Sequence, residues 1–203
     1  ALPRGITAGA MLDARSASAP SAPAAIRRED YRAPDWLVPA VSLDFELDPA
    51  RTLVRARLEV RRNGEHDRPL RLDGEELELL KLTVDGAPAE PAFENGQLVV
   101  ALTGASAVVE TEVAIAPEKN SQLMGLYASG GILCTQCEAE GFRRITFFPD
   151  RPDVLSRYTV RLEANRAAYP VLLANGNPVE EGAGEDGRHH AVWEDPFPKP
   201  SYL

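Results

Sequence analysis

The sequence of 203 residues has few of the residues that build metal centres and disulfide frameworks, with only two cysteines and three histidines. Cys134 and Cys137 do not make a disulfide framework, and a reducing cytoplasm is the compartment we expect. A structural zinc site needs four ligands, and neither a second Cys-x-x-Cys pair nor a suitably spaced pair of histidines is present. We therefore interpret the two cysteines as ordinary buried or half-buried thiols and expect no metal to be bound by this stretch.

Long apolar runs and an excess of basic residues are also missing. No stretch of about 18 apolar residues occurs, so no transmembrane helix is expected, and the N-terminus lacks the apolar core of a secretory signal. The net charge of −9 leaves no basic stripe for nucleic-acid phosphates. These absences indicate a soluble globular protein whose partners include neither a membrane nor a nucleic acid.

The common hydrolase motifs are missing as well. A Gly-x-Ser-x-Gly nucleophile elbow is absent, and His66, His189 and His190 offer no compelling base for a catalytic triad. The motif His-Glu-x-x-His, in which two histidines of one helix bind zinc, is absent too. We therefore assign no catalytic residue in this chain and predict that it has no enzymatic activity alone.

What the sequence does contain is alternation of apolar and polar residues. Val41–Leu47 and Thr52–Val60 alternate, and acidic outer residues of the first oppose basic ones of the second, which predicts an antiparallel pair joined by a turn at Asp48-Pro49-Ala50. Turn signals recur about every 8–12 residues and helical periodicity is weak, which predicts an all-β fold, a sandwich or saddle. The other predicted strands are Pro69–Leu72, Leu77–Val84, Gln97–Leu102, Ala107–Ile115, Arg144–Phe148, Val154–Glu163, Tyr169–Leu173 and Ala191–Trp193.

The chain divides into a lead-in and one domain. Residues 1–26 are rich in Ala, Ser and Pro without periodicity, and we interpret them as a disordered lead-in. Residues 27–203 form the predicted β domain, in which Gln122–Gly131 is expected to be a loop and Asn175–Gly187 a turn followed by an acidic, glycine-rich loop. The chain stops at Leu203, on apolar residues just after a proline-rich segment, so we expect a domain boundary there.

The densest chemistry lies in Leu133–Arg157. If Leu133–Glu138 is extended, the side chains of Cys134, Gln136 and Glu138 share one face. A carboxylate and an amide carbonyl projected together suit a cation that also donates hydrogen bonds, such as the free amino terminus of a peptide. Spacing alone favours a simpler alternative, in which both are polar residues of a loop or edge strand, hydrogen-bonded to the backbone.

Charged and aromatic residues follow this pair. They predict a local ion-pair network that orders a turn and is formed by Arg143, Arg144, Asp150, Arg151 and Asp153. Three aromatic residues are expected in the core, namely Phe147, Phe148 and Tyr158.

In this same region the chain resembles a known family. It is similar to the N-terminal domain of bacterial aminopeptidase N enzymes, the zinc-dependent alanyl-aminopeptidases of the gluzincin metallopeptidases, in the stretches GLYASGG, TQCEAEGFRRITFFPDRPDVLSRYTVRLEA, LLANGN and WEDPFPKPSYL. Two earlier stretches, YRAPDW and LRLDGEEL, match the same family. The resemblance extends from about Tyr31 to Leu203, and the block TQCEAEGFR makes it highly specific.

The resemblance implies an all-β, saddle-like domain that packs against a thermolysin-like catalytic domain following Leu203. In this family the zinc ligands, the general base and a Gly-Ala-Met-Glu-Asn motif belong to that second domain, and this chain has none of them. The parent protein would be a zinc-dependent hydrolase that removes N-terminal amino acids from peptides. Gln136 and Glu138 match family positions that line the first substrate subsite and hold the free α-amine. Glu138 is then a specificity residue with no acid–base role.

Two other functions stay open at this point. The chain could be a stand-alone, non-enzymatic β-sandwich interaction module, with Cys134–Glu138 as its binding edge. A redox switch formed by Cys134 and Cys137 is the third hypothesis. The sequence that follows Leu203 separates the first two functions, and thiol titration under mild oxidation tests the third.

Overall fold

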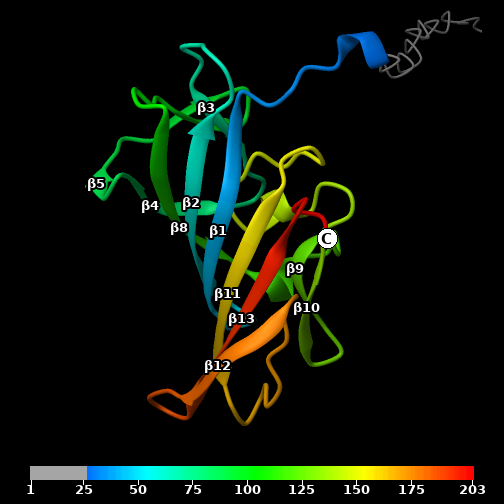
Figure 1. The fold of residues 1–203 in the computed structure, drawn as a ribbon. Coiled ribbons are helices and arrows are strands. Elements are labelled where there is room, and N and C mark those ends of the chain that lie inside the picture. The colour runs from blue at the N-terminus through cyan, green and yellow to red at the C-terminus, as the bar shows by residue number, and fades with distance from the viewer. Residues whose placement is uncertain (1–26) are drawn as a thin grey trace, which may run out of the picture. The chain divides into compact units, whose positions relative to one another are not determined.

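The computed structural model describes residues 27–203 (Figure 1), so the lead-in predicted for residues 1–26 lies outside the described residues. The chain falls into two units. Residues 27–32, at the end of the first unit, contain the 3-10 turn η1 (Arg28–Asp30), and the second unit, Ala33–Leu203, is almost entirely β. No helix among residues 27–203 has the length and apolar content needed to cross a membrane.

An eight-stranded sheet is the larger layer of the second unit, in the order β12-β13-β11-β1-β2-β8-β4-β5 (Figure 1). Its strands are β1 (Trp36–Glu46), β2 (Thr52–Arg62), β4 (Glu78–Val84), β5 (Ala87–Pro88), β8 (Ser106–Ile115), β11 (Ser156–Asn165), β12 (Asn177–Ala183) and β13 (Arg188–Lys199). All neighbours are antiparallel except β1 and β11, which are parallel. A parallel pair needs a crossover connection, and the chain between β1 and β11 carries both smaller sheets. The predicted all-β class is confirmed.

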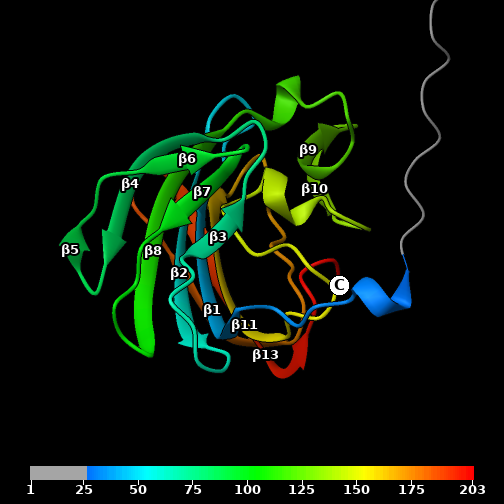
Figure 2. The same ribbon diagram turned by 90° about the horizontal axis from the view of Figure 1, so that it is seen from above.

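Two smaller sheets cover one face of the long sheet (Figure 2). One has the order β3-β7-β6 and the other is the hairpin of β9 and β10; their strands are β3 (Leu70–Asp73), β6 (Ala92–Glu94), β7 (Gln97–Val100), β9 (Gly125–Ser129) and β10 (Ile132–Gln136). The 3-10 turns η2 (Pro117–Lys119) and η3 (Phe142–Arg144) both contact β9. All three sheets share one core cluster, which includes Leu43, Val54, Leu58, Leu72, Leu98, Val109 and Leu126.

The predicted alternation of the first two strands is confirmed. The inner residues of β1 and β2 are buried, while Arg55 on the outer face donates to Glu46 on β1 (Nη1–Oε1 2.6 Å) and to Glu112 on β8 (Nε–Oε2 2.7 Å). At the turn between the strands, the Asp48 carboxylate accepts the N–H of Ala50 (2.8 Å). Half-exposed ion pairs of this kind contribute about 0.2–1 kcal/mol each, so they select the register more than they stabilise the sheet.

The predicted strand Arg144–Phe148 is wrong. Its first residue ends η3, where the Arg144 N–H donates to the Gly141 carbonyl (3.1 Å). At its other end Phe148 forms only an isolated bridge with Asp73. The run is apolar because it fills the core beside η3, and burial without strand pairing leaves the same pattern in a sequence.

The predicted strand Tyr169–Leu173 is wrong as well. The Tyr169 N–H turns back to the Asn165 carbonyl (2.9 Å), and Pro170 has no N–H to give to a neighbouring strand. Only Leu172 of this stretch is buried, with 9% of its surface exposed, while Val171 is 68% exposed. A short alternation next to a proline therefore marks a surface connection here.

Two stretches that were expected to be loops contain strands. Strand β9 lies within Gln122–Gly131, and Gly130 and Gly131, with φ of +58° and +82°, form the two-residue turn that joins it to β10. A Gly-Gly pair is itself a hairpin signal, which the loop interpretation overlooked. Strand β12 lies within the predicted acidic loop; it is a mostly exposed edge strand, so it has no apolar alternation to reveal it.

Leu72→Ala tests whether the small sheet of β3 belongs to the same core as the long sheet. Leu72 is fully buried, so removing its side chain leaves a cavity, and we expect the free energy of unfolding to fall by about 2–5 kcal/mol in one transition. Urea unfolding followed by tryptophan fluorescence measures it. Arg71→Ala, on the exposed side of β3, is the matched control and should cost less than about 1 kcal/mol. A separate early transition for the small sheet would contradict a single core.

Candidate functional site

The two predicted site residues, Gln136 and Glu138, lie at the end of the β9–β10 hairpin. Strand β10 ends at Gln136. Glu138 lies beyond it in a turn, which the Gly141 N–H closes by donating to the Cys137 carbonyl (2.9 Å). The expectation of one extended strand through Glu138, with Cys134, Gln136 and Glu138 on one face, is therefore wrong.

Two glycines allow η3 to approach the hairpin and end the strand. A Cβ on Gly141 would lie 2.5 Å from the Gln136 carbonyl oxygen and 2.8 Å from the Cys137 Cα, so only glycine permits this approach. On β9, Gly125 has a φ of +75°, and an added Cβ would lie 2.7 Å from the Arg144 Cβ. The turn that carries Glu138 is thus held against η3 by backbone contacts.

Both candidate side chains are exposed. They lie on an edge strand and a turn, as the simpler alternative predicted, but neither is hydrogen-bonded to the backbone or ion-paired within residues 27–203. Gln136 and Glu138 are two positions apart, so their backbones are close neighbours. A carboxylate and an amide that are not used by the fold are therefore available to an external ligand.

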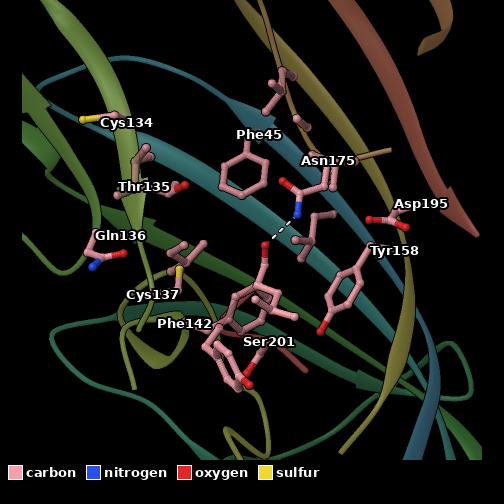
Figure 3. A pocket seen from close by; sticks show the side chains of 18 of the residues that line it. Phe45, Cys134, Thr135, Gln136, Cys137, Phe142, Tyr158, Asn175, Asp195 and Ser201 are labelled. Atoms are coloured by element: carbon pink, nitrogen blue, oxygen red, sulfur yellow. Dashed lines mark hydrogen bonds between the residues drawn. The ribbon is translucent and has the colours of Figure 1, made fainter. Parts of the chain in front are cut away.

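A cavity of about 420 Å³ lies between the hairpin and the inner face of the long sheet (Figure 3). Its apolar wall includes Leu43, Phe45, Leu133, Phe142, Val160 and Leu162. Figure 3 shows Thr135, Gln136 and Cys137 on the hairpin side and Tyr158 and Asp195 on the side of the long sheet. Gln136 belongs to the lining, whereas Glu138 does not. The two predicted residues therefore lie close together, at the end of β10 and in the turn after it, but only Gln136 lines the cavity.

Two polar groups of the cavity, the Tyr158 hydroxyl and the Cys137 thiol, are desolvated by burial. Burial raises the pKa of the Tyr158 hydroxyl, and the nearby Ser156 side chain offsets this only in part. Burial, and then the negative charge of Asp150, raises the pKa of the Cys137 thiol to about 12. Asp195 is ion-paired with Lys199. At pH 7 the Cys137 sulfur is thus a neutral thiol and a weak nucleophile.

The cysteines match the interpretation as half-buried thiols. Cys134 and Cys137 are both partly exposed, and both are free. Within residues 27–203, no group of three or more His, Cys, Asp or Glu residues is placed to hold a metal ion. The donor sets in the described part of the chain therefore do not fit a zinc site, which needs at least three protein ligands.

The predicted ion-pair network is confirmed for two of its pairs. Arg143 Nε donates to Asp150 Oδ2 (3.1 Å), and Arg151 Nη2 donates to Asp153 Oδ2 (2.6 Å). The first pair is far from water, because the Asp150 side chain is 1% exposed. The network therefore orders the turn after η3, as predicted.

Arg144 and Ser201 make contacts that sequence reasoning missed. Arg144 leaves the local network and pairs with Glu75 (Nη2–Oε1 2.5 Å) and Glu76 (Nη1–Oε2 2.8 Å). The Ser201 hydroxyl donates to Asp150 Oδ1 (2.5 Å). Both contacts join residues more than 50 positions apart, so no spacing in the sequence signals them.

The three predicted core aromatics lie beneath this network. Phe147 and Phe148 are buried, and Tyr158 is half-buried. Phe142 of η3 packs edge-on against Phe148 and Tyr158, with ring centroids 5.0 and 6.2 Å away. Edge-on aromatic pairs add about 0.5–1.5 kcal/mol of stability beyond the burial of apolar area, so the packing of Phe142 helps to hold η3 against the core.

Comparison with known proteins identifies relatives along most of the chain. Residues 40–203 match the family described as the Peptidase M1 N-terminal domain. Aminopeptidase N of Caulobacter vibrioides is 52% identical over 184 residues, which is 89% of this chain and 21% of that protein. Aminopeptidase N of Escherichia coli is 47% identical over 182 residues, again 89% of this chain and 21% of that protein. The chain thus spans about a fifth of the length of these relatives.

Solved structures agree with this assignment. Aminopeptidase A of Legionella pneumophila, in complex with aspartic acid, superposes with a TM-score of 0.79 at 32% identity, over 86% of this chain and 21% of that one. An M1 zinc metallopeptidase from Deinococcus radiodurans superposes with a TM-score of 0.70 at 17% identity, over 83% of this chain and 41% of that one, a likeness of fold alone. Family match, identity and fold agree with the resemblance found in the sequence: the chain belongs to the Peptidase M1 N-terminal domain family.

Proposed function

We propose that this chain acts as the N-terminal, substrate-binding and structural domain of a zinc aminopeptidase, a hydrolase that removes N-terminal amino acids from peptides. In this proposal Gln136 and Glu138 bind the free α-amine of the substrate. The observation that carries it is the exposed Glu138 carboxylate, which follows Gln136 by two positions and has no partner within residues 27–203. Because the fold itself does not use this carboxylate, it can accept hydrogen bonds from a ligand.

The chemistry of the pair suits an ammonium group. A carboxylate that accepts a hydrogen bond from a cation forms a charge-assisted bond worth about 1.5–3 kcal/mol, and a neutral amide carbonyl adds less. Holding the amine fixes the position of the first peptide bond and disfavours peptides whose amino terminus is blocked. Glu138 would act as a specificity residue and Gln136 as its weaker partner, and neither would transfer a proton.

The bond-breaking part would lie elsewhere in the parent protein. Zinc there would polarise the peptide carbonyl or activate water. Because the described part of this chain has no suitable ligand set, we propose that the ion is held by a catalytic domain that is an intramolecular partner of this one. This chain's own share is to bind and orient the amino terminus, and alone it would be inactive.

Compartment and ligand follow the same proposal. We propose that the protein lies in the cytoplasm, because both cysteines are free thiols and a reducing compartment keeps thiols in that state. Peptide amino termini would be the ligands, and the net charge of −9 is favourable for cations.

The alternative is a stand-alone interaction module, for which an unpaired edge of β10 would be the binding surface. Finding Gly-Ala-Met-Glu-Asn and His-Glu-x-x-His in the reading frame after Leu203 would exclude that alternative.

Glu138→Ala in the full-length enzyme tests the amine-binding role. Removing the carboxylate takes away a charge-assisted bond, so we expect kcat/KM for a simple aminoacyl substrate to fall about 10- to 100-fold. Glu140→Ala is the matched control, because Glu140 is an exposed carboxylate of the same turn. Its one ion pair, with Arg143 at 3.5 Å, is at the surface and weak, so the change should alter kcat/KM by less than about twofold. Unchanged kinetics in Glu138→Ala would refute the assignment.

Substrates with a blocked amino terminus provide a second test. If the pair recognises the amine, the preference for a free over an N-acetylated peptide should shrink in Glu138→Ala and, less strongly, in Gln136→Ala. Each variant loses a hydrogen-bond acceptor for the ammonium group, which the acetylated peptide lacks. The ratio of the two kcat/KM values measures it. A ratio that stays at the wild-type value in both variants would show that discrimination arises elsewhere.

A further inference from the structure

We propose that Asp150 is a positioning residue for the Gln136–Glu138 pair: its buried carboxylate holds η3, and η3 holds the turn that carries Glu138. Asp150 itself touches no substrate. The inference rests on the proposed amine-binding function, and it adds a residue that acts through another one. Three sets of contacts carry it.

The first set joins Asp150 to Arg143. Oδ2 of Asp150 accepts both the backbone N–H of Arg143 (3.1 Å) and its side-chain Nε (3.1 Å). Arg143 Nη2 donates in return to the Asp150 carbonyl oxygen (3.2 Å). The side chains of the two residues are 1% and 22% exposed, so water competes little for these bonds. Charge-assisted bonds of this kind are about twice as strong as neutral ones.

The second set joins η3 to the candidate site. Arg143 is the middle residue of η3, and the residue before that turn is Gly141, whose N–H donates to the Cys137 carbonyl (2.9 Å). Because there is no room even for a Cβ between Gly141 and the Gln136 carbonyl, movement of η3 toward the hairpin would push the end of β10, and movement away would break the Gly141–Cys137 hydrogen bond that closes the Glu138 turn. The position of Glu138 therefore depends on where Arg143 is held.

The third set fixes Asp150 to the rest of the fold. Its Oδ1 accepts the Ser201 hydroxyl (2.5 Å), and its backbone N–H donates to Asp73 Oδ2 (3.1 Å). Asp73 is the last residue of β3 and accepts a further bond from Gln97 of β7 (Nε2–Oδ1 2.8 Å). Asp150 thus links η3 to two separate segments of the fold, namely the small sheet of β3 and the segment after β13.

The negative charge of Asp150 is what distinguishes it from an amide at this position. Two carboxylate oxygens accept from three donors, namely the backbone N–H and Nε of Arg143 and the hydroxyl of Ser201. An asparagine could turn its one oxygen to the two Arg143 donors and its NH₂ group to the Ser201 hydroxyl, which can also accept, so the hydrogen bonds could persist without the negative charge. It would leave the guanidinium of Arg143 without its buried counter-ion. Asp150→Asn keeps the volume of the side chain and removes the charge that strengthens its bonds to Arg143.

The test uses the full-length enzyme and a free aminoacyl substrate. Since Asp150 acts on binding of the amine, Asp150→Asn should raise KM about 5- to 10-fold while kcat changes by less than about twofold. Glu163→Gln is the matched control: Glu163 is a half-buried carboxylate of β11 that pairs with Arg161 and Arg188 and does not line the cavity. It should lower thermal stability as Asp150→Asn does but leave KM within about twofold of wild type.

A double-mutant cycle separates positioning from general destabilisation. If Asp150 acts through Glu138, Asp150→Asn should change kcat/KM by less than about twofold once Glu138→Ala is present, because the group it positions is gone. A purely structural effect would multiply with that of Glu138→Ala. Multiplying effects, or an unchanged KM in Asp150→Asn, would overturn the inference.

Two further outcomes are kept apart. Should Asp150→Asn fail to fold, Arg143→Lys takes its place in the same cycle, since it keeps the positive charge and loses the Nε bond. The same rise in KM and the same lack of multiplication are expected from it, and their absence overturns the inference. If Glu138→Ala itself leaves kcat/KM unchanged, the amine-binding proposal fails, whatever Asp150 does.

Discussion

The long sheet has one apolar face, and covering that face is the constraint on which the rest of the structure depends. The inner residues of β1, β2 and β8 are almost fully buried, while the opposite face carries charged rows. A sheet with this asymmetry is stable only when something excludes water from its apolar side. Two small sheets, η3 and the segment after β13 provide the cover, and all the chemistry of interest lies on that covering layer.

The covering layer is incomplete over β1 and β11, and the candidate site lies at the edge of this gap. The β9–β10 hairpin leaves a cavity lined by Leu43, Phe45 and Val160. Because the hairpin has few strands, it depends on neighbouring segments: η2 and η3 both contact β9, and η3 approaches closely at Gly125 and Gly141. The direction of the Glu138 turn is therefore a property of tertiary packing, which a two-stranded hairpin could not supply by itself.

Much of the fold could be predicted from the sequence because its strands alternate. Val41–Leu47, Thr52–Val60 and Ala107–Ile115 were predicted from period-two patterns; the last two lie within β2 and β8, and the first runs one residue past the end of β1 at Glu46. The period-two pattern failed where a segment is buried without pairing to a strand, or is paired without being buried. Arg144–Phe148 is buried without pairing, and β12 is paired without burial, so apolar alternation misjudged both.

The candidate site shows the same division between what a sequence reveals and what only packing decides. Gln136 and Glu138 were singled out from their chemistry and from a family resemblance, but the shared strand face assigned to them was wrong. The turn after Gln136 depends on Gly141 meeting the Gln136 carbonyl, and that contact depends on η3. The contact of Ser201 with Asp150 spans 51 positions, beyond any local pattern.

If two domains share one site, as we propose, the exposure of Glu138 has a physical explanation. Burying an unpaired carboxylate during folding of this domain would be costly, whereas leaving it at the surface costs little. At the surface, an ion pair with an ammonium contributes only about 0–1 kcal/mol, because water screens it. Once a second surface excludes water, the same bond contributes about 1.5–3 kcal/mol. In the proposed arrangement one domain would hold the acceptor in a fixed direction, and its partner would exclude water from the bond and so strengthen it. The amine would then be bound firmly only where the bond can also be cut.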